Sequence, residues 1–414
     1  MTHAHSWWQT GVIYQIYPRS FLDSNGDGIG DLSGITSKLD YLQWLGIDAL
    51  WLSPIYPSPM ADFGYDITNY TDVHPLFGTL EDVDTLLEQA HQRDLKVILD
   101  FVPNHTSDEH PWFQQARESR TNEKRDWYIW RDPAPNGGPP NNWISNFGGS
   151  AWHLDEPTGQ YYLHMFDVKQ PDLNWRHQEV RQAMYAVMRF WLERGIDGFR
   201  VDALHALLED EQFRDNPLNP AWKPGDPPFT RQLGRYTEDQ PGMQDISLQP
   251  ELMLDPQGKD NPKYSRDPAR SPMQWNGSVN AGFCSAGVKP WLPIADDFQT
   301  YNVTVEQHDP RSFVTLVCRL LALRRALPAL TLGSQQSIDQ PNAACFVYQR
   351  QYADQRCLVI LNFSAQEQVV ALPEQEQGRL LLSTHLDREG PPPLSDVHLR
   401  GNEGLLIEMK ASSP

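Results

Sequence analysis

The chain has 414 residues, enough for two or three domains, and its 39% hydrophobic and 21% charged residues are ordinary for a globular protein. The formal net charge of −20 argues against nucleic acid and anionic membranes as partners, because both are bound through clustered Lys and Arg. No basic stretch followed by an apolar run opens the sequence, and no apolar run approaches the roughly 18 residues of a membrane helix. The four cysteines form no CxxC pair, so we expect a cytoplasmic protein with reduced thiols.

Strand-like and helix-like segments alternate through the first half of the chain. Runs rich in β-branched and aromatic residues occur at 11–21, 47–56, 96–104 and 195–204. The run at 96–104 is apolar on both faces, as a buried parallel strand requires. Helical periodicity occurs at 80–94 and 177–195, and the second segment has one apolar stripe of Val180, Ala183, Met184, Val187, Met188 and Trp191. This alternation predicts a parallel α/β fold.

Two regions have a different texture. Residues 105–175 are rich in Trp, Pro, Asn and Gly, and we interpret them as a loop domain inserted after the third strand. An amphipathic helix is expected at 311–330. After it, short strands separated by turn residues are expected at 344–352, 356–364, 367–373, 378–386 and 404–410. They predict a small antiparallel β domain.

The number of strands is too small for a closed (β/α)8 barrel, which needs eight. Only four strand-like runs precede the helix at 311–330. The stretch 214–310 is rich in Asp, Asn, Pro and Gly, and it has no buried β-branched run. A strand-free stretch of that length counts against a simple barrel.

Two strand ends bear polar residues that are able to support chemistry. DFVPNHTS (100–107) places Asp100, Asn104 and His105 at the end of the third strand, where a satisfied polar cluster is an equally good interpretation. In GFRVDALHA (198–206), Arg200 and Asp202 lie two apart on a strand and therefore face the same side. The arginine would keep the carboxylate ionised, as a glycosidase nucleophile requires, although structural ion pairs are also common in such strands.

Two further segments are compatible with sugar binding, although each is unspecific alone. FGYDITNY (63–70) follows Asp62 and offers Tyr65 for stacking and carboxylates for hydrogen bonds. QPDLNW (170–175) precedes the amphipathic helix at 177–195.

The segment DSNGDGIGDLSGI (23–35) has the oxygen ligands that a hard cation prefers, at Asp23, Asn25, Asp27 and Asp31. It begins like an EF-hand loop, but the twelfth position is Gly34 where an EF-hand has its bidentate Glu. An EF-hand is therefore excluded. A loop that binds one structural Ca²⁺ or Mg²⁺ is expected, and the alternative is a metal-free turn.

Taken together and in this order, these segments resemble glycoside hydrolase family 13, the α-amylase superfamily. Within it they are most similar to the exo-acting α-glucosidases and oligo-1,6-glucosidases. DFVPNHTS, GFRVDALHA, QPDLN and DSNGDGIGDL carry the resemblance, and RDPARSPMQW (266–275) and STHLDREG (383–390) are similar to the family's late segments. The resemblance covers nearly the whole chain.

The resemblance implies a role for each matching residue. Asp202 would be the nucleophile and Arg200 would hold it ionised. Asp62, Tyr65 and His105 would line the subsite of the non-reducing glucose, Asp100 and Asn104 would shape it, and Arg270 would reach the substrate. Asp23, Asn25, Asp27, Asp31 and the carbonyl of Ile29 would bind Ca²⁺ or Mg²⁺. The small Ala203 after the nucleophile would favour α-1,4 links, as in maltose and maltooligosaccharides, over α-1,6 links.

The chain departs from the family pattern in one large respect. No strand ends in the general-acid Glu of the fifth strand, and the Asn-His pair that precedes the third carboxylate occurs only at Asn104-His105. Residues 236–246 and 247–268 are similar to parts of the family that lie far apart, so strands five to eight would be missing at a junction near 246–247. We therefore expect an incomplete TIM-type barrel at 1–104 and 176–330, an inserted domain at 105–175 and an antiparallel β domain at 331–414.

Three interpretations follow from that departure. The chain is an α-glucosidase that has lost its acid, with Glu209, Glu211, Glu238 or Glu251 as a compensating acid in one version. The second interpretation is a non-catalytic glucan-binding or regulatory protein, and the third is a damaged sequence without a stable function. In each case an open half-barrel would expose strand edges and apolar surface, which predicts self-association.

Overall fold

Four parallel strands form the central sheet of the computed structural model, which describes residues 6–224, 254–255, 265–340, 343–372, 378–388, 390 and 394–410. Their order is β1 (Ile13–Ile16), β2 (Ala49–Leu52), β3 (Lys96–Phe101) and β7 (Gly198–Val201). The inner strand β3 is buried along nearly its whole length, as its apolar sequence predicts. The two outer strands are more exposed, because each has a sheet neighbour on one side only.

Helices cover one face of this sheet. They are α2 (Pro18–Phe21), α3 (Leu32–Thr36), α4 (Leu39–Leu45), α5 (Leu80–His91) and α7 (Gln178–Arg194), whereas the short helix α1 (Trp7–Thr10) precedes β1. Helix α5 begins at a capping box between Thr79 and Asp82, and α7 ends at Gly195, whose φ of 110° suits glycine. The predicted stripe of α7 is largely buried, and the Trp191 indole donates to the Tyr70 carbonyl at 2.7 Å.

The inserted segment has more regular structure than expected. It contains helix α6 (Pro111–Glu118), the 3-10 turn η1 (Arg125–Trp127) and a three-stranded antiparallel sheet of β4 (Trp130–Arg131), β6 (Gln160–Leu163) and β5 (Trp152–Asp155). The loop domain predicted after the third strand thus includes one helix and one small sheet. Aromatic side chains hold the segment together, including Phe113, which stacks on Trp130 with ring centroids 5.5 Å apart.

The last part of the chain is antiparallel β structure, as predicted. One sheet has the order β12 (Gly378–Ser383), β14 (Gly404–Met409), β10 (Gln355–Asn362), β9 (Cys345–Tyr352) and β8 (Ser334–Ser337). A second sheet pairs β11 (Gln368–Val370) with β13 (Val397–Leu399), so the strand expected at 367–373 is shorter than predicted. Two strands were not predicted from the sequence: β8, which is polar, and β13 (Val397–Leu399), which has three residues.

Among the described residues between the central sheet and the C-terminal β structure, there are three α-helices: α9 (Val303–His308), α10 (Phe313–Ala326) and α11 (Pro328–Leu332). Helix α10 rests against α4, where Leu321 lies beside Gly46 and Cys318 lies near Tyr41. Arg325 at its end donates to the Ile47 carbonyl at 2.9 Å. Helix α10, late in the chain, therefore packs beside α4, which lies near its start.

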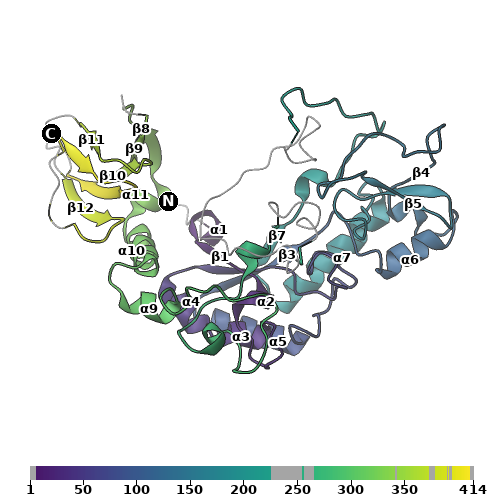
Figure 1. Cartoon of the computed structure of the whole chain (residues 1–414), viewed down its shortest axis with the longest axis horizontal. Coiled ribbons are helices and arrows are strands. Elements are labelled where there is room, and N and C mark those ends of the chain that lie inside the picture. The colour runs from purple at the N-terminus through teal and green to yellow at the C-terminus, as the bar shows by residue number, and fades with distance from the viewer. Residues whose placement is uncertain are drawn as a thin grey trace.

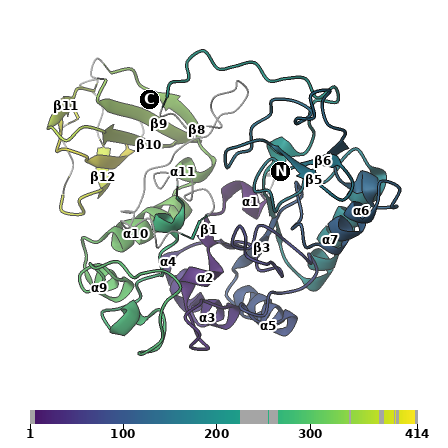
Figure 2. The same ribbon diagram turned by 45° about the vertical axis from the view of Figure 1, so that its right-hand side comes forward.

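The molecule has the form of an arch (Figure 1). The C-terminal β structure and the inserted segment are its two arms, and the sheet with its helices lies between them (Figures 1 and 2). In the described part of the chain, no helix combines the length and the apolar character needed to cross a membrane.

Candidate active site

Asp202 and Arg200 lie at the carboxyl end of β7, next to the end of β3. The Asp202 amide donates to the Phe101 carbonyl at 2.8 Å, which continues the β3–β7 ladder through the end of the strand. The Arg200 guanidinium donates to Asp202 and, at 3.0 Å, to Asp100 Oδ1. One arginine therefore holds the side chains of both aspartates on the same side of the sheet.

Asp100 is fully buried and hydrogen-bonded on both oxygens. Its Oδ2 accepts from the Tyr65 hydroxyl at 3.0 Å and from the Trp51 indole at 3.3 Å. Burial raises the pKa of Asp100 to about 6, although the neighbouring Arg200 opposes this. Burial lowers the pKa of the Arg200 guanidinium, but the carboxylates of Asp100 and Asp202 raise it by more, so the guanidinium stays charged.

His105, Gln170 and Asp62 form a second buried group. The Gln170 amide donates to His105 Nε2 at 2.9 Å and to Asp62 Oδ2 at 3.1 Å, so the histidine donates from Nδ1 to Asn104 Oδ1 at 2.8 Å. Burial lowers the pKa of His105, which keeps the imidazole neutral near pH 7. Asn104 Nδ2 in turn donates to the Ala206 carbonyl at 2.6 Å, which ties this group to the segment that follows Asp202.

Arg266 closes the other side of Asp62. Its guanidinium donates to Asp62 Oδ1 at 2.6 Å and also bonds Asp255, whose side chain is fully buried. Arg270 lies one turn further on, with Nη1 3.7 Å from Asp255 Oδ1, and its guanidinium lies over the Tyr17 ring. Arg270 thus contacts the group that holds Asp62 without bonding Asp62 itself.

The structure brings together most of the residues that the sequence predicted for the site. Contacts through Gln170 and Tyr65 join the two groups, because the His105 ring also lies 3.2 Å from the Tyr65 carbonyl. The residues joined in this way are Asp62, Tyr65, Asp100, Asn104, His105, Arg200 and Asp202. The sequence analysis assigned no role to Gln170, Arg266 or Asp255. Gln170 and Arg266 open the segments QPDLNW and RDPARSPMQW, so those matching segments were the available signal.

Two of the four glutamates considered as a substitute acid are described. Burial raises the pKa of Glu209 to about 7, and the charges that act on it are those of Arg176 and Arg131. Glu211 is exposed and pairs with Arg176 at 2.9 Å. Glu238 and Glu251 lie outside the described residues. In the described part of the chain no strand occurs between β7 and β8, so no strand end there presents a glutamate beside Asp202.

Hydrogen bonds within the segment 23–35, where an ion is predicted, hold its conformation. Asp23 accepts from the amides of Gly26 and Gly28, and Asp31 accepts from the Ser24 hydroxyl and the Gly34 amide. Among the described residues, no three acidic, histidine or cysteine side chains lie close enough to share an ion. An ion held by Asp23, Asn25, Asp27, Asp31 and the carbonyl of Ile29 stays a prediction.

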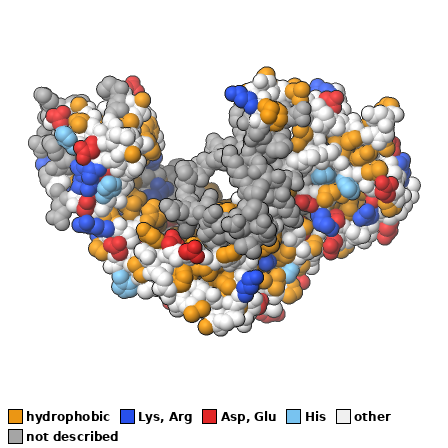
Figure 3. Space-filling model, viewed as in Figure 1, with side chains coloured by type: hydrophobic (Ala, Val, Ile, Leu, Met, Phe, Trp, Pro, Cys, Tyr) orange, Lys and Arg blue, Asp and Glu red, His pale blue; other side chains and the backbone are white. Residues whose placement is uncertain are grey.

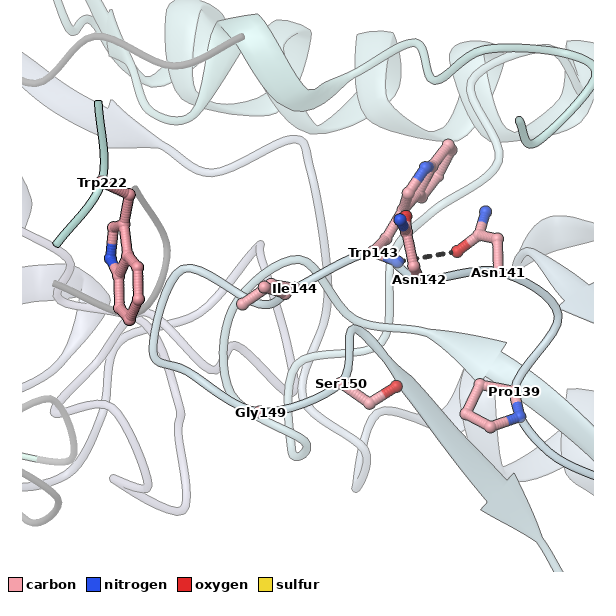
Figure 4. A pocket seen from close by; sticks show the side chains of 8 residues that line it. All are labelled: Pro139, Asn141, Asn142, Trp143, Ile144, Gly149, Ser150 and Trp222. Carbon is pink, nitrogen blue, oxygen red and sulfur yellow. Dashed lines mark hydrogen bonds between the residues drawn. The ribbon is translucent and has the colours of Figure 1, made fainter. Parts of the chain in front are cut away.

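A pocket of about 570 Å³ lies beside the inserted segment (Figure 4). Trp222 faces it from one side, and Asn142, Trp143 and Ile144 line the other (Figure 4). The pocket shares no residue with the group around Asp202. The side chain of Trp143 is hydrogen-bonded to the Arg214 carbonyl at 2.9 Å, so it anchors the pocket wall.

Comparison with known proteins assigns the class. Residues 15–253 and 235–333 match the family described as alpha amylase, catalytic domain. The chain therefore belongs to the α-amylase family, glycoside hydrolase family 13. The two matches meet at 235–253, a range that contains the predicted junction near 246–247.

Within that family the chain is similar to α-glucosidases and oligo-1,6-glucosidases. It is 54% identical to a probable alpha-glucosidase of Rhizobium meliloti and 53% identical to an oligo-1,6-glucosidase of Heyndrickxia coagulans. Each alignment covers 57% of this chain, but the chain spans less than half of each relative: 44% and 41%. The similarity of this chain to these two relatives is thus confined to part of their length.

An alignment with the trehalose-6-phosphate hydrolase of Bacillus subtilis spans 99% of both proteins at 32% identity. It extends over 562 residues, whereas this chain has 414, so a long stretch of that relative has no counterpart here. The structure is similar to that of the alpha-glucosyl transfer enzyme XgtA, with a TM-score of 0.90 and 34% identity over 98% of this chain and 100% of the other. The trehalulose synthase MutB from Pseudomonas mesoacidophila MX-45 follows, with a TM-score of 0.87 and 29% identity over the same shares.

Proposed function

We propose that this chain binds the terminal glucosyl unit of short α-linked gluco-oligosaccharides and has lost nearly all of the hydrolytic activity of its α-glucosidase relatives. The observation that supports this is the pairing of an intact group around Asp62, Asp100 and Asp202 with the lack of a fifth-strand glutamate in the described residues. Buried carboxylates and a neutral histidine offer fixed acceptors and donors for sugar hydroxyls. Phe147 and Phe166, whose rings are 6.0 Å apart beside His105 and Arg266, offer apolar surface for the sugar face.

A retaining glycosidase needs two carboxyl groups about 5–5.5 Å apart, one as nucleophile and one as acid. Asp202, which is paired with Arg200, would be the nucleophile. Asp100 is no substitute acid, because its oxygens are already engaged by Arg200, Tyr65 and Trp51. Without an acid a sugar alkoxide leaves poorly, and general-acid assistance contributes roughly 10²–10⁴-fold.

The second candidate is a glucan-binding or regulatory protein that never uses Asp202 as a nucleophile. The same group supports it, because each contact around Asp62 serves binding equally well. The two candidates differ in one respect only: the first predicts a glucosyl-enzyme from an activated substrate, and the second does not.

Calorimetric titration with maltose tests the binding function. We expect saturable binding, and we expect Asp62→Ala to weaken it by about tenfold or more, since a buried partner of the sugar would be lost. Asp210→Ala, which removes an exposed ion pair with Arg214, is the matched control and should bind as the wild type does. Isomaltose should bind more weakly than maltose, because the small Ala203 follows Asp202. Failure of the folded protein to bind maltose would refute the proposal.

A further inference from the structure

The two edges of the central sheet are both open in the described residues. Strand β1 has a neighbour on one side only, and so has β7. The Asp202 amide points to β3, and because amides alternate along a strand, those of Phe199 and Val201 point to the opposite edge. Ile13 on β1 and Val201 on β7 are 45% and 39% exposed, which is unusual for apolar side chains in a parallel sheet.

Helix α10 also has exposed apolar side chains. None of its residues from Phe313 to Ala326 is buried, whereas α5 and α7 each bury four. Phe313 is 70% exposed and Leu320 is 39% exposed. Figure 3 shows apolar side chains along the base of the arch. A helix of a closed barrel would cover a strand, whereas apolar side chains of α10 are exposed here.

The strand edges fit each other. Both belong to one parallel sheet, so β7 of one molecule and β1 of another can pair in parallel at two places related by a two-fold axis. Four strands from each molecule give the eight of a closed barrel. We propose that this face is an interface between two copies of the chain, which close one eight-stranded barrel between them.

The register of the strands supports a second copy of the chain as the partner at this face. Pairing across the sheet sets Gln15 level with Trp51, Ile98 and Gly198. A barrel of this kind has a shear of about 8, so each half contributes a stagger of about four residues. In one direction this stagger sets Arg200 of one copy opposite Ile13 of the other, and the strands overlap. In the other direction β7 would face α2 (Pro18–Phe21), which is helical.

This inference is independent of the proposed function. The strand that would occupy the fifth position is a second β1, which ends at Ile16 and is followed by Tyr17. Closure would therefore supply no glutamate, and a dimer would still lack the acid. The net charge of −20 on each copy opposes association, so added salt should strengthen it.

Sedimentation velocity of the full chain at roughly 1 to 100 µM tests the proposal. We expect a reversible monomer–dimer equilibrium without larger species, tighter at 500 mM than at 50 mM NaCl. Ile13→Lys and Val201→Lys should each raise the dissociation constant by about tenfold or more, because they place a charge at the paired edge. Val369→Lys is the matched control, since Val369 is 48% exposed on β11 in the C-terminal β structure.

If the edge variants fail to fold, hydrogen exchange on the wild type gives the answer. The amides of Phe199 and Val201 should exchange more slowly at high protein concentration than at low concentration, whereas those of β11 should not change. A monomer at every concentration would overturn the proposal, since a segment of the same chain would then cover the face. Open-ended growth to large species, or an equal effect of Val369→Lys, would overturn it as well.

Discussion

The Arg266 guanidinium donates to the Asp62 carboxylate at 2.6 Å, although 204 residues separate the two in the sequence. Arg266 also bonds the fully buried Asp255. A segment far along the chain from Asp62 therefore closes the end of the site that lies next to His105 and Gln170. Arg266 thus bonds two buried carboxylates, and Arg270 lies near one of them, Asp255.

Arg266→Ala should be strongly destabilising. Removing one partner of a buried pair leaves an uncompensated charge, at a cost of about 3–5 kcal/mol in the free energy of unfolding. Denaturant unfolding of wild type and variant at pH 7 measures the difference. Maltose binding should be lost as well, because Asp62 would lose the group that orients it.

Arg214→Ala is the control for that experiment. Arg214 pairs with Asp210, but its side chain is 72% exposed, and exposed pairs contribute little. We expect no measurable change in stability or in maltose binding. Equal effects of the two substitutions would show that the Arg266 pairs are not special.

Asp202 should still attack a substrate that needs no acid. Fluoride leaves without a proton, so α-glucosyl fluoride should give at most a slow burst of fluoride release, while maltose and aryl α-glucosides are not hydrolysed detectably. Hydrolysis of the glucosyl-enzyme by water would need the missing glutamate as a general base, so turnover should stay slow. A stopped fluoride-electrode assay measures the burst.

Asp202→Asn should abolish the burst, and Asp210→Ala should leave it intact. If wild type gives no burst while maltose still binds, the glucan-binding alternative is correct. Robust hydrolysis of maltose that disappears in Asp202→Asn would refute the loss of the acid.

Glu209 should make stability depend on pH. Burial raises its pKa to about 7, so the folded state holds a proton that the unfolded state loses near pH 4.5. The stability that this proton contributes is full below about pH 4.5 and is lost as the pH rises to about 7. Glu209→Gln should therefore gain about 1–3 kcal/mol over wild type at pH 8 and little at pH 4.5. Urea unfolding at both pH values measures the gain, and an equal difference at the two would contradict the assignment.

The loop at 23–31 tests the predicted ion. If Ca²⁺ binds there, it should raise the melting temperature and EDTA should reverse the rise. The shift should be small, because Asp23 and Asp31 already order the loop through backbone amides. Asp27→Ala should remove the calcium effect without unfolding the protein, since Asp27 accepts a hydrogen bond from the amide of Ile29, two residues away. If neither calcium nor EDTA changes the melting temperature, the metal-free turn is the correct interpretation.

Local patterns predicted the parts of the fold that depend on local physics. The stripe of the helix at 177–195 and the apolar run at 96–104 each require burial wherever they lie, and both are buried in the structure. Asp100, Arg200 and Asp202 could be placed together because adjacent parallel strands end at the same edge.

Other features depend on contacts between distant segments. The Arg266–Asp62 pair joins residues that no periodicity connects, and β8 is a polar strand that forms only because β9 offers it an edge. In the inserted segment, Trp and Pro were interpreted as loop residues, but packing of Phe113 on Trp130 stabilises a small sheet there. The predicted division into 1–104, 105–175, 176–330 and 331–414 remains a prediction in its boundaries.

The contact between α4 and α10 has a consequence for synthesis of the protein. A ribosome adds about 5–20 residues per second, so roughly 15 to 50 seconds pass between the emergence of α4 and that of α10. During that time Tyr41 and its neighbours on α4 have no helix to cover them. A nascent chain of this protein should therefore be most vulnerable to aggregation late in translation, and chaperones that bind emerging apolar segments should raise its yield more than folding at low temperature does.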